Sequence, residues 1–296
     1  MTPTRRGLLL AGGSGVVAGC GTTDGAAPGT RDATATAAAS AIGPAIGPAT
    51  PTEPTAALPD PEPWQPVGDE VEPDAKLAAA RAVEELGAGG GRVTRVVYPQ
   101  YGGLLDSSAC VMVVAVESRR SGDRVRRRRL VADVRLRRRS GRWRVVSVDR
   151  APTARAAQVR GPAAQVVGRP RIDLSGAALA DLRDGRVDPL VVDVLDRLAE
   201  EVRLSVSVLA SGHPRMVFGT DSVSNHTRGR AVDVWALDGT PVAELPLDSP
   251  LLLRVLTRAA ELGSDEVGGP VVPPVTSGVH FANPLHRDHV HVGFDV

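Results

Sequence analysis

The sequence predicts an α+β protein in which two folded units follow an export signal and a disordered tether. Three observations indicate this. Residues 21–67 are poor in large apolar side chains, a helical pattern followed by strand patterns occupies residues 68–150, and helical and strand patterns are mixed in residues 171–296. The chain of 296 residues is long enough for two domains of ordinary size.

The overall composition excludes two classes of protein. Hydrophobic residues make up 42% and the mean hydropathy is −0.05, which excludes an array of membrane-spanning helices. The net charge of +1 provides no global basic field, and aromatic residues at 3% provide few surfaces for stacking bases. We therefore expect no nucleic-acid partner.

Residues 1–20 have the features of a bacterial lipoprotein signal peptide. Arg5 and Arg6 supply the charged start, resemble a twin-arginine export motif, and precede an apolar run that is too short to span a bilayer. The segment Val17–Cys20 resembles a lipobox, in which small residues precede the lipidated cysteine. We expect Cys20 to anchor the protein to the extracytoplasmic face of the membrane. The alternative is an uncleaved start with a buried cysteine.

The Gly, Thr, Ala and Pro-rich residues 21–67 predict a disordered linker, because they cannot bury enough surface to offset the entropy of ordering. Its reach of roughly 40 Å would hold a domain within cell-wall distance of the anchor. With Cys20 lipidated, Cys110 has no partner for a disulfide. Because Cys110 lies in an apolar strand pattern, we expect a buried and unreactive thiol.

Residues 68–150 predict a small helix-plus-sheet domain. The apolar spacing indicates a helix over residues 74–86, followed by strands near residues 92–98, 110–118, 130–138 and 143–148. One helix followed by a curled antiparallel sheet is similar to the cone-shaped domains of the NTF2-like superfamily. That resemblance implies a spacer or a site for a protein partner, and we find no catalytic group here. The arginine-rich strand predicts a solvated face, with anionic polymer or lipid as the alternative partner.

A connector over residues 151–170 leads to a second α+β domain at residues 171–296. Asp188 is expected to cap a helix that ends near residue 201. Further elements are predicted along the chain: a strand at residues 204–209, a helix at 250–262, a Gly/Pro loop at 263–284 and a strand at 289–294.

All six histidines of the chain follow residue 212, so any metal chemistry belongs to the second domain. They are His213, His226, His280, His286, His289 and His291. We expect His213 and His280 to lie in loops. The turn Asp238-Gly239 is not expected to bind metal.

Two histidine clusters have the spacing of a metal site. His226 precedes a glycine turn, and Asp233 follows seven residues later in a predicted strand, so one metal could contact both. In the last strand, alternation places His289 and His291 on one face, opposite a face of apolar side chains. Two imidazoles, one carboxylate and an open fourth position suit catalytic Zn²⁺.

These residues resemble the zinc peptidases of the D-Ala-D-Ala carboxypeptidase type, including penicillin-insensitive murein endopeptidases, in an actinobacterial-type lipoprotein. The resemblance covers roughly residues 185–296. The family's motif Ser-x-His-x-x-Gly-x-Ala-x-Asp is matched in full by Ser224, His226, Gly229, Ala231 and Asp233, and its later histidine by His291. The resemblance implies His226, Asp233 and His291 as zinc ligands and peptidoglycan stem or cross-link peptides as substrates.

The chain departs from that family at the expected proton acceptor. The carboxypeptidases have a glutamate three residues before the last ligand, where this chain has the shorter Asp288. Asp288 or His286 would accept the proton of the attacking water, and His289 is a further candidate or a structural residue. Arg215 is shifted by one position from the family's arginine, and Arg228 is a second candidate to stabilise the oxyanion.

The sequence leaves two functions open. The first is an exported, lipid-anchored zinc peptidase with D,D- or L,D-specificity. The second is a non-catalytic lipoprotein that binds cell wall or acts as a scaffold with the same fold. A periplasmic solute-binding protein fits less well, because such proteins need two large α/β lobes.

Overall fold

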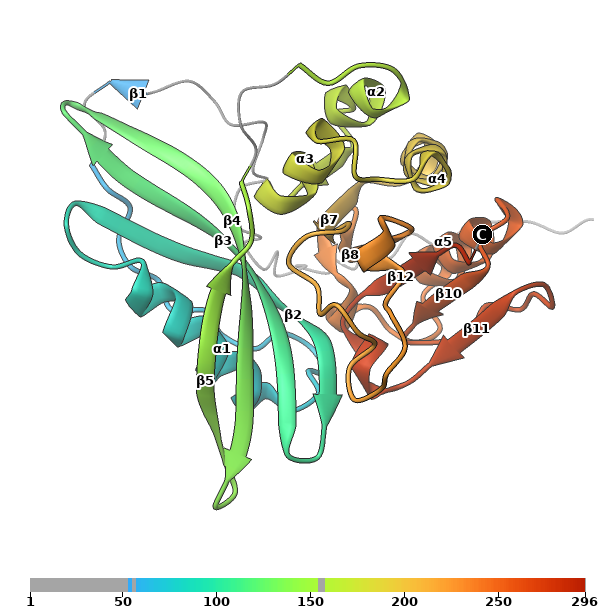
Figure 1. Ribbon diagram of the computed structural model, residues 1–296, viewed down its shortest axis with the longest axis horizontal. Coiled ribbons are helices and arrows are strands. Elements are labelled where there is room, and N and C mark those ends of the chain that lie inside the picture. The colour runs from blue at the N-terminus through green and yellow to red at the C-terminus, as the bar shows by residue number, and fades with distance from the viewer. Residues whose placement is uncertain (1–52, 55–56, 154–157, 296) are drawn as a thin grey trace, which may run out of the picture. The chain divides into compact units, whose positions relative to one another are not determined.

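The computed structural model describes residues 53–54, 57–153 and 158–295 (Figure 1). These residues contain both helices and sheets, consistent with the expected α+β class. The expected signal peptide, with Cys20, and most of the expected linker lie outside the described residues. Within the described ranges, no helix is long and apolar enough to cross a membrane.

The first sheet is antiparallel and has the strand order β1-β4-β3-β2, with β5 paired to the same β4 (Figure 1). Helix α1 (Pro73–Leu86) packs against one of its faces. The strands are β1 (Glu53–Pro54), β2 (Arg92–Leu105), β3 (Ser108–Ser121), β4 (Arg124–Arg139) and β5 (Arg142–Arg150). This bears out the expected helix and four strands, which extend further than their apolar cores indicated.

Strand β3 is buried on both faces, which explains its nearly continuous apolar run. Val111 and Val113 pack toward α1, whereas Cys110 and Met112 pack with Val208, which belongs to the second sheet. The Cys110 thiol is buried as expected, and burial raises its pKa well above the ordinary value. The arginine-rich start of β4 is mostly exposed, in agreement with a solvated face.

The second sheet is mixed and has the order β11-β10-β12-β8-β7-β6, with β9 beside β8. Helices α4 (Pro189–Glu201) and α5 (Pro250–Glu261) contribute to its main apolar core. Its strands are β6 (Ile172–Leu174), β7 (Leu204–Val208), β8 (Ala231–Leu237), β9 (Thr240–Pro241), β10 (Glu266–Gly269), β11 (Val279–Ala282) and β12 (Val290–Gly293).

Local signals predicted the long helices of this half well. Asp188 caps α4 by accepting a hydrogen bond from the Leu190 amide at 3.0 Å, and Ser249 caps α5. The expected loop over residues 263–284 was wrong in part, because β10 and β11 lie within it. The expected connector over residues 151–170 contains helix α2 (Pro162–Gly168), and helix α3 (Gly176–Arg183) follows β6. These short elements depend on packing more than on their own periodicity.

Glycines with positive φ flank strand β8 at both ends. Gly229 has φ 73°, and an added Cβ would lie 1.9 Å from the carbonyl oxygen of Arg186. Gly239 has φ 86° in the turn to β9, and an added Cβ would meet nothing within 4 Å. Only Gly229 is therefore required for a close approach as well as for its backbone angle.

We predict that Gly229→Ala destabilises the protein by more than Gly239→Ala. The latter substitution suffers only the cost of a left-handed backbone, on the order of 1–2 kcal/mol. Gly229→Ala adds a collision with backbone that flexible side-chain motion cannot relieve. Denaturant unfolding of both variants measures the difference, and equal losses would contradict the packing argument.

Candidate metal centre

The pairing of β12 with β8 places His291 directly opposite Asp233. Their neighbours along both strands point to the other face, into the core beneath α4 and α5: Val232, Val234, Val290 and Val292. The alternation expected for the last strand is thus observed. The Nδ1 atom of His291 lies 3.0 Å from Oδ1 of Asp233.

His226 joins this pair from the short helix η1 (His226–Arg228) that precedes β8. Its Nε2 lies 3.1 Å from Oδ1 of Asp233 and 3.3 Å from Nδ1 of His291. Its Nδ1 lies 2.7 Å from the carbonyl oxygen of Leu209, which can only accept, so the Nδ1 atom carries a proton. This contact orients the ring so that Nε2 faces the shared carboxylate oxygen.

The carboxylate of Glu266 orients His291, as the carbonyl of Leu209 orients His226. Nε2 of His291 lies 3.5 Å from Glu266, and its Nδ1 faces Asp233. Burial lowers the pKa of His291, but the hydrogen bonds to these two carboxylates raise it to about 9. Burial also opposes ionisation of Asp233, yet the neighbouring histidines lower its pKa well below the ordinary value. The centre thus attracts a proton or a cation.

His213 also belongs to the cluster formed by His226, Asp233 and His291. From the sequence, His213 was expected to lie in a loop and to have no role. Its ring stacks on His226 with centroids 4.2 Å apart. His213, His226 and Asp233 present ligand atoms within 4.8 Å of one another, so they form a candidate metal-binding group. Burial and the charge of His226 lower the pKa of His213 well below its usual value, which keeps the imidazole neutral. The third ligand is therefore either His291 or His213.

Both oxygens of Asp288, the expected proton acceptor, are already engaged. Oδ1 accepts from Nδ1 of His289 at 2.6 Å, while Oδ2 lies 2.6 Å from the Lys76 ammonium and accepts from the Tyr101 amide at 3.0 Å. Burial raises the pKa of Asp288, but Lys76 and His289 bring it below the ordinary value. Asp288 thus directs Nε2 of His289 toward Asp233, 3.8 Å away.

His286 lies at the half-buried edge of the cluster, in the short helix η3 (Pro284–Arg287). Its ring centroid is 4.8 Å from that of His289 and 5.8 Å from that of His291. Asn283 accepts from the backbone amide of His286, and the same oxygen lies 2.9 Å from Nδ1. Burial, with the charges of the nearby histidines, lowers the pKa of His286 to about 2, so the ring is neutral near pH 7.

The remaining expected residues lie around the cluster. Ser224 is buried, and its hydroxyl accepts from the amide of His226 at 3.3 Å, which stabilises the turn of the motif. Arg215 and Arg228 are exposed. The backbone carbonyl of Arg215 accepts from Thr227, and the guanidinium of Arg228 donates to Asn225. Among the described residues, no hydrogen bond or ion pair joins either guanidinium to a histidine of the cluster.

The structure also corrects or adds positions that had no local signal. His280 lies in strand β11 and not in a loop. Glu266, Gln100 and Lys76 reach the cluster from distant parts of the chain. One signal was available: Lys76 is the sole lysine among 35 basic residues, but nothing in the sequence connects it with a carboxylate 212 positions later.

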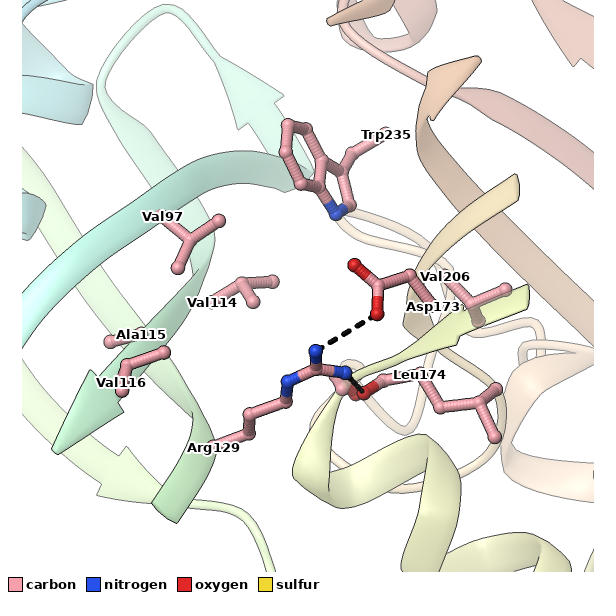
Figure 2. Close-up of a pocket in the computed structure, with 10 residues that line it drawn as sticks. Val97, Val114, Ala115, Val116, Arg129, Asp173, Leu174, Val206 and Trp235 are labelled. Atoms are coloured by element: carbon pink, nitrogen blue, oxygen red, sulfur yellow. Dashed lines mark hydrogen bonds and ion pairs between the residues drawn. The ribbon is translucent and has the colours of Figure 1, made fainter. Parts of the chain in front are cut away.

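A small cavity of ≈ 20 Å³ lies elsewhere, between β3 and β6 (Figure 2). Figure 2 shows Trp235 above it and Arg129 at its edge, paired with Asp173 at 2.9 Å. Arg129 also donates to the carbonyl of Leu174 at 2.7 Å. A cavity of this size holds about one water molecule, so it does not compete with the histidine cluster as a functional site.

Comparison of the chain with protein-family models, with curated proteins and with solved structures found no match. The function is therefore argued from the residues of the cluster.

We predict that His291→Ala abolishes metal binding, whereas His213→Ala keeps the metal with weaker affinity. The reason is that Nε2 of His226 lies 3.3 Å from Nδ1 of His291, and these two nitrogens lie 3.1 Å and 3.0 Å from the same oxygen, Oδ1 of Asp233. Metal content after dialysis and competition with a chelator measure both variants. Retention of metal in His291→Ala and loss in His213→Ala would identify His213 as the third ligand.

Proposed function

We propose that this protein is an exported, lipid-anchored zinc peptidase that acts on stem or cross-link peptides of peptidoglycan. The observation that carries the proposal is the convergence of two imidazole nitrogens, Nε2 of His226 and Nδ1 of His291, on Oδ1 of the buried Asp233. The same three residues complete the motif that resembles the zinc carboxypeptidases and murein endopeptidases.

The donor set fits zinc. Two imidazoles and one carboxylate are a common set of three protein ligands for catalytic Zn²⁺, and each histidine here has an acceptor on its other nitrogen that orients it. When bound, zinc supplies a nucleophile at neutral pH by lowering the pKa of a coordinated water to about 7, and it polarises a carbonyl.

The proton would be accepted by His286. Its ring lies at the half-buried edge of the cluster and is less buried than Asp288 and His289. Asp288 is less suited to this role than its spacing suggested, because Lys76, Tyr101 and His289 use both of its oxygens. We assign Asp288 the task of orienting His289.

A specific observation favours the second candidate, a lipoprotein that holds a metal and binds cell wall without cleaving it. His226, Asp233, Asp288 and His289 are each at most 2% exposed, so much of the cluster is closed to a large substrate. In that function the metal would stabilise the fold, and His286 could be replaced without consequence for binding. Turnover separates the two functions.

We predict that the purified full chain loaded with zinc cleaves isolated muropeptides, and that His286→Ala lowers its turnover by roughly 10²- to 10⁴-fold, the usual contribution of a general base. Asp288→Asn should lower it less. Zinc should remain bound in both variants, and mass spectrometry of the digest identifies the cleaved bond.

His280→Ala is the matched control, because it removes a half-buried histidine of β11 whose ring nitrogens have no hydrogen-bond partner among the described residues. Zinc-loaded protein that leaves all muropeptides intact would exclude the peptidase and leave the binding function.

The proposed anchor makes a separate prediction. Cys20→Ala should abolish labelling of the protein with a fatty-acid analogue in a bacterial host and release it from the membrane fraction, because the lipid is attached to this thiol. Unchanged labelling would show that the segment Val17–Cys20 is not a lipobox.

A further inference from the structure

The sole lysine of the chain is buried among partners from both halves of the protein. Lys76 is in α1, and its ammonium contacts Glu70, lies 2.6 Å from Oδ2 of Asp288 and lies 3.2 Å from the hydroxyl of Tyr98. The side chains of Lys76, Glu70 and Asp288 are between 0% and 3% exposed. A charge buried to this extent needs its partners, because water cannot replace them.

Gln100 of β2 makes the second contact of the first sheet with the cluster. Its amide nitrogen donates to Oδ2 of Asp233 at 2.8 Å, and its amide oxygen accepts from the Ser207 hydroxyl. The Gln100 side chain is fully buried. The adjacent amide of Tyr101 donates to Asp288. Two successive residues of β2 therefore contact the two carboxylates of the cluster.

The local shape of β2 permits this approach. Its pairing with β3 is irregular on both sides of this segment, between Val96 and Tyr98 and between Tyr101 and Gly103. Such bulges bend a strand and redirect its side chains. Tyr98, within the segment, stacks on Trp235 of β8 with centroids 5.0 Å apart, which holds β2 against the second sheet.

Each carboxylate of the cluster divides its two oxygens in the same manner. Oδ1 of Asp233 faces the histidines and its Oδ2 accepts from Gln100. Oδ1 of Asp288 orients His289 and its Oδ2 faces Lys76. The first sheet and its helix thus supply the outer partner of each acid, while the second sheet supplies the histidines.

We infer that the first sheet and α1 complete the metal centre and do not serve as a spacer. Gln100 is a positioning residue that presents Oδ1 of Asp233 to the metal. Lys76 is a positioning residue that holds Asp288, which in turn orients His289. This inference rests on the proposed metal site. It extends that site to Gln100, which is 133 positions before Asp233, and to Lys76, which is 212 positions before Asp288.

Metal binding by the full chain tests this inference directly. Co²⁺ is the probe, because its visible absorption reports coordination geometry whereas Zn²⁺ has no such spectrum. Groups that hold a metal ligand from behind usually contribute 10- to 100-fold to metal affinity. We expect Gln100→Leu to weaken Co²⁺ binding by that amount and to alter the spectrum. Lys76→Met should alter the spectrum with a smaller loss of affinity, because Lys76 acts on Asp233 only through Asp288 and His289, whose Nε2 lies 3.8 Å from Asp233.

Two control variants separate positioning from general stability. Val96→Ala shortens a buried apolar side chain of the same strand that cannot hydrogen-bond to either acid, and should lower the melting temperature but not the Co²⁺ affinity. Arg81→Met removes a positive charge from the exposed side of the same helix and should change neither property of the centre.

The outcomes are distinct. Folded Gln100→Leu or Lys76→Met with the Co²⁺ affinity and spectrum of the wild type would overturn the role of that residue. If Lys76→Met does not fold, Gln100→Leu carries the test, because leucine replaces the amide with an apolar group of similar size. A wild-type chain that binds no Co²⁺ and no Zn²⁺ would overturn both this inference and the proposed function.

Discussion

The buried carboxylate of Asp233 is the group on which the arrangement of the centre depends. A carboxylate removed from water needs a partner for each oxygen, and here the partners come from several separate elements. The register of β8 with β12 places His291 opposite it, the glycine turn before β8 returns His226 to it, and β2 brings Gln100. A shift of either strand by one residue would move Asp233 or His291 to the core face.

Charge balance connects the two sheets through the same centre. Glu70 and Asp288 are both buried, and the ammonium of Lys76 lies between them. Burial raises the pKa of Glu70, although Lys76 opposes that effect. Removal of one member of such a group is usually far more destabilising than the group is stabilising, because the others remain buried without compensation. The contact between the sheets is therefore specific as well as apolar.

The metal centre is more buried on the side that faces β2 than on its other sides. The side facing β2 is closed by Gln100 and Tyr101, whereas His213, His286 and Phe281 on other sides are half-buried. Phe281 lies 4.7 Å from His286 and 5.9 Å from His291 between ring centroids. In the proposed peptidase, the substrate would reach the cluster along this aromatic edge. The same geometry would suit a metal that only stabilises the fold, which is why turnover decides between the two functions.

The sequence by itself determined the elements with strong local signals and the residues of the principal cluster. The caps at Asp188 and Ser249, the helix of residues 74–86 and the alternation around His291 depend on neighbours a few residues away. It also indicated His226 and Asp233, because their motif is a local turn that leads into a strand. The short strands β10 and β11 were missed, since their pairing depends on partners far along the chain.

The tertiary structure alone decided which distant groups surround the cluster. Glu266 reaches His291 through the pairing of β10 with β12, and His213 reaches His226 from a loop without periodicity. Gln100 and Lys76 could not be predicted from the sequence, because no characteristic sequence spacing relates a buried amide or ammonium to the carboxylate that it contacts. The sequence predicted Asp288 as a free proton acceptor, but Lys76 of α1 and the Tyr101 amide of β2 occupy its Oδ2. Local propensity acts over a few residues, whereas the environment of a buried charge is set by every element that packs against it.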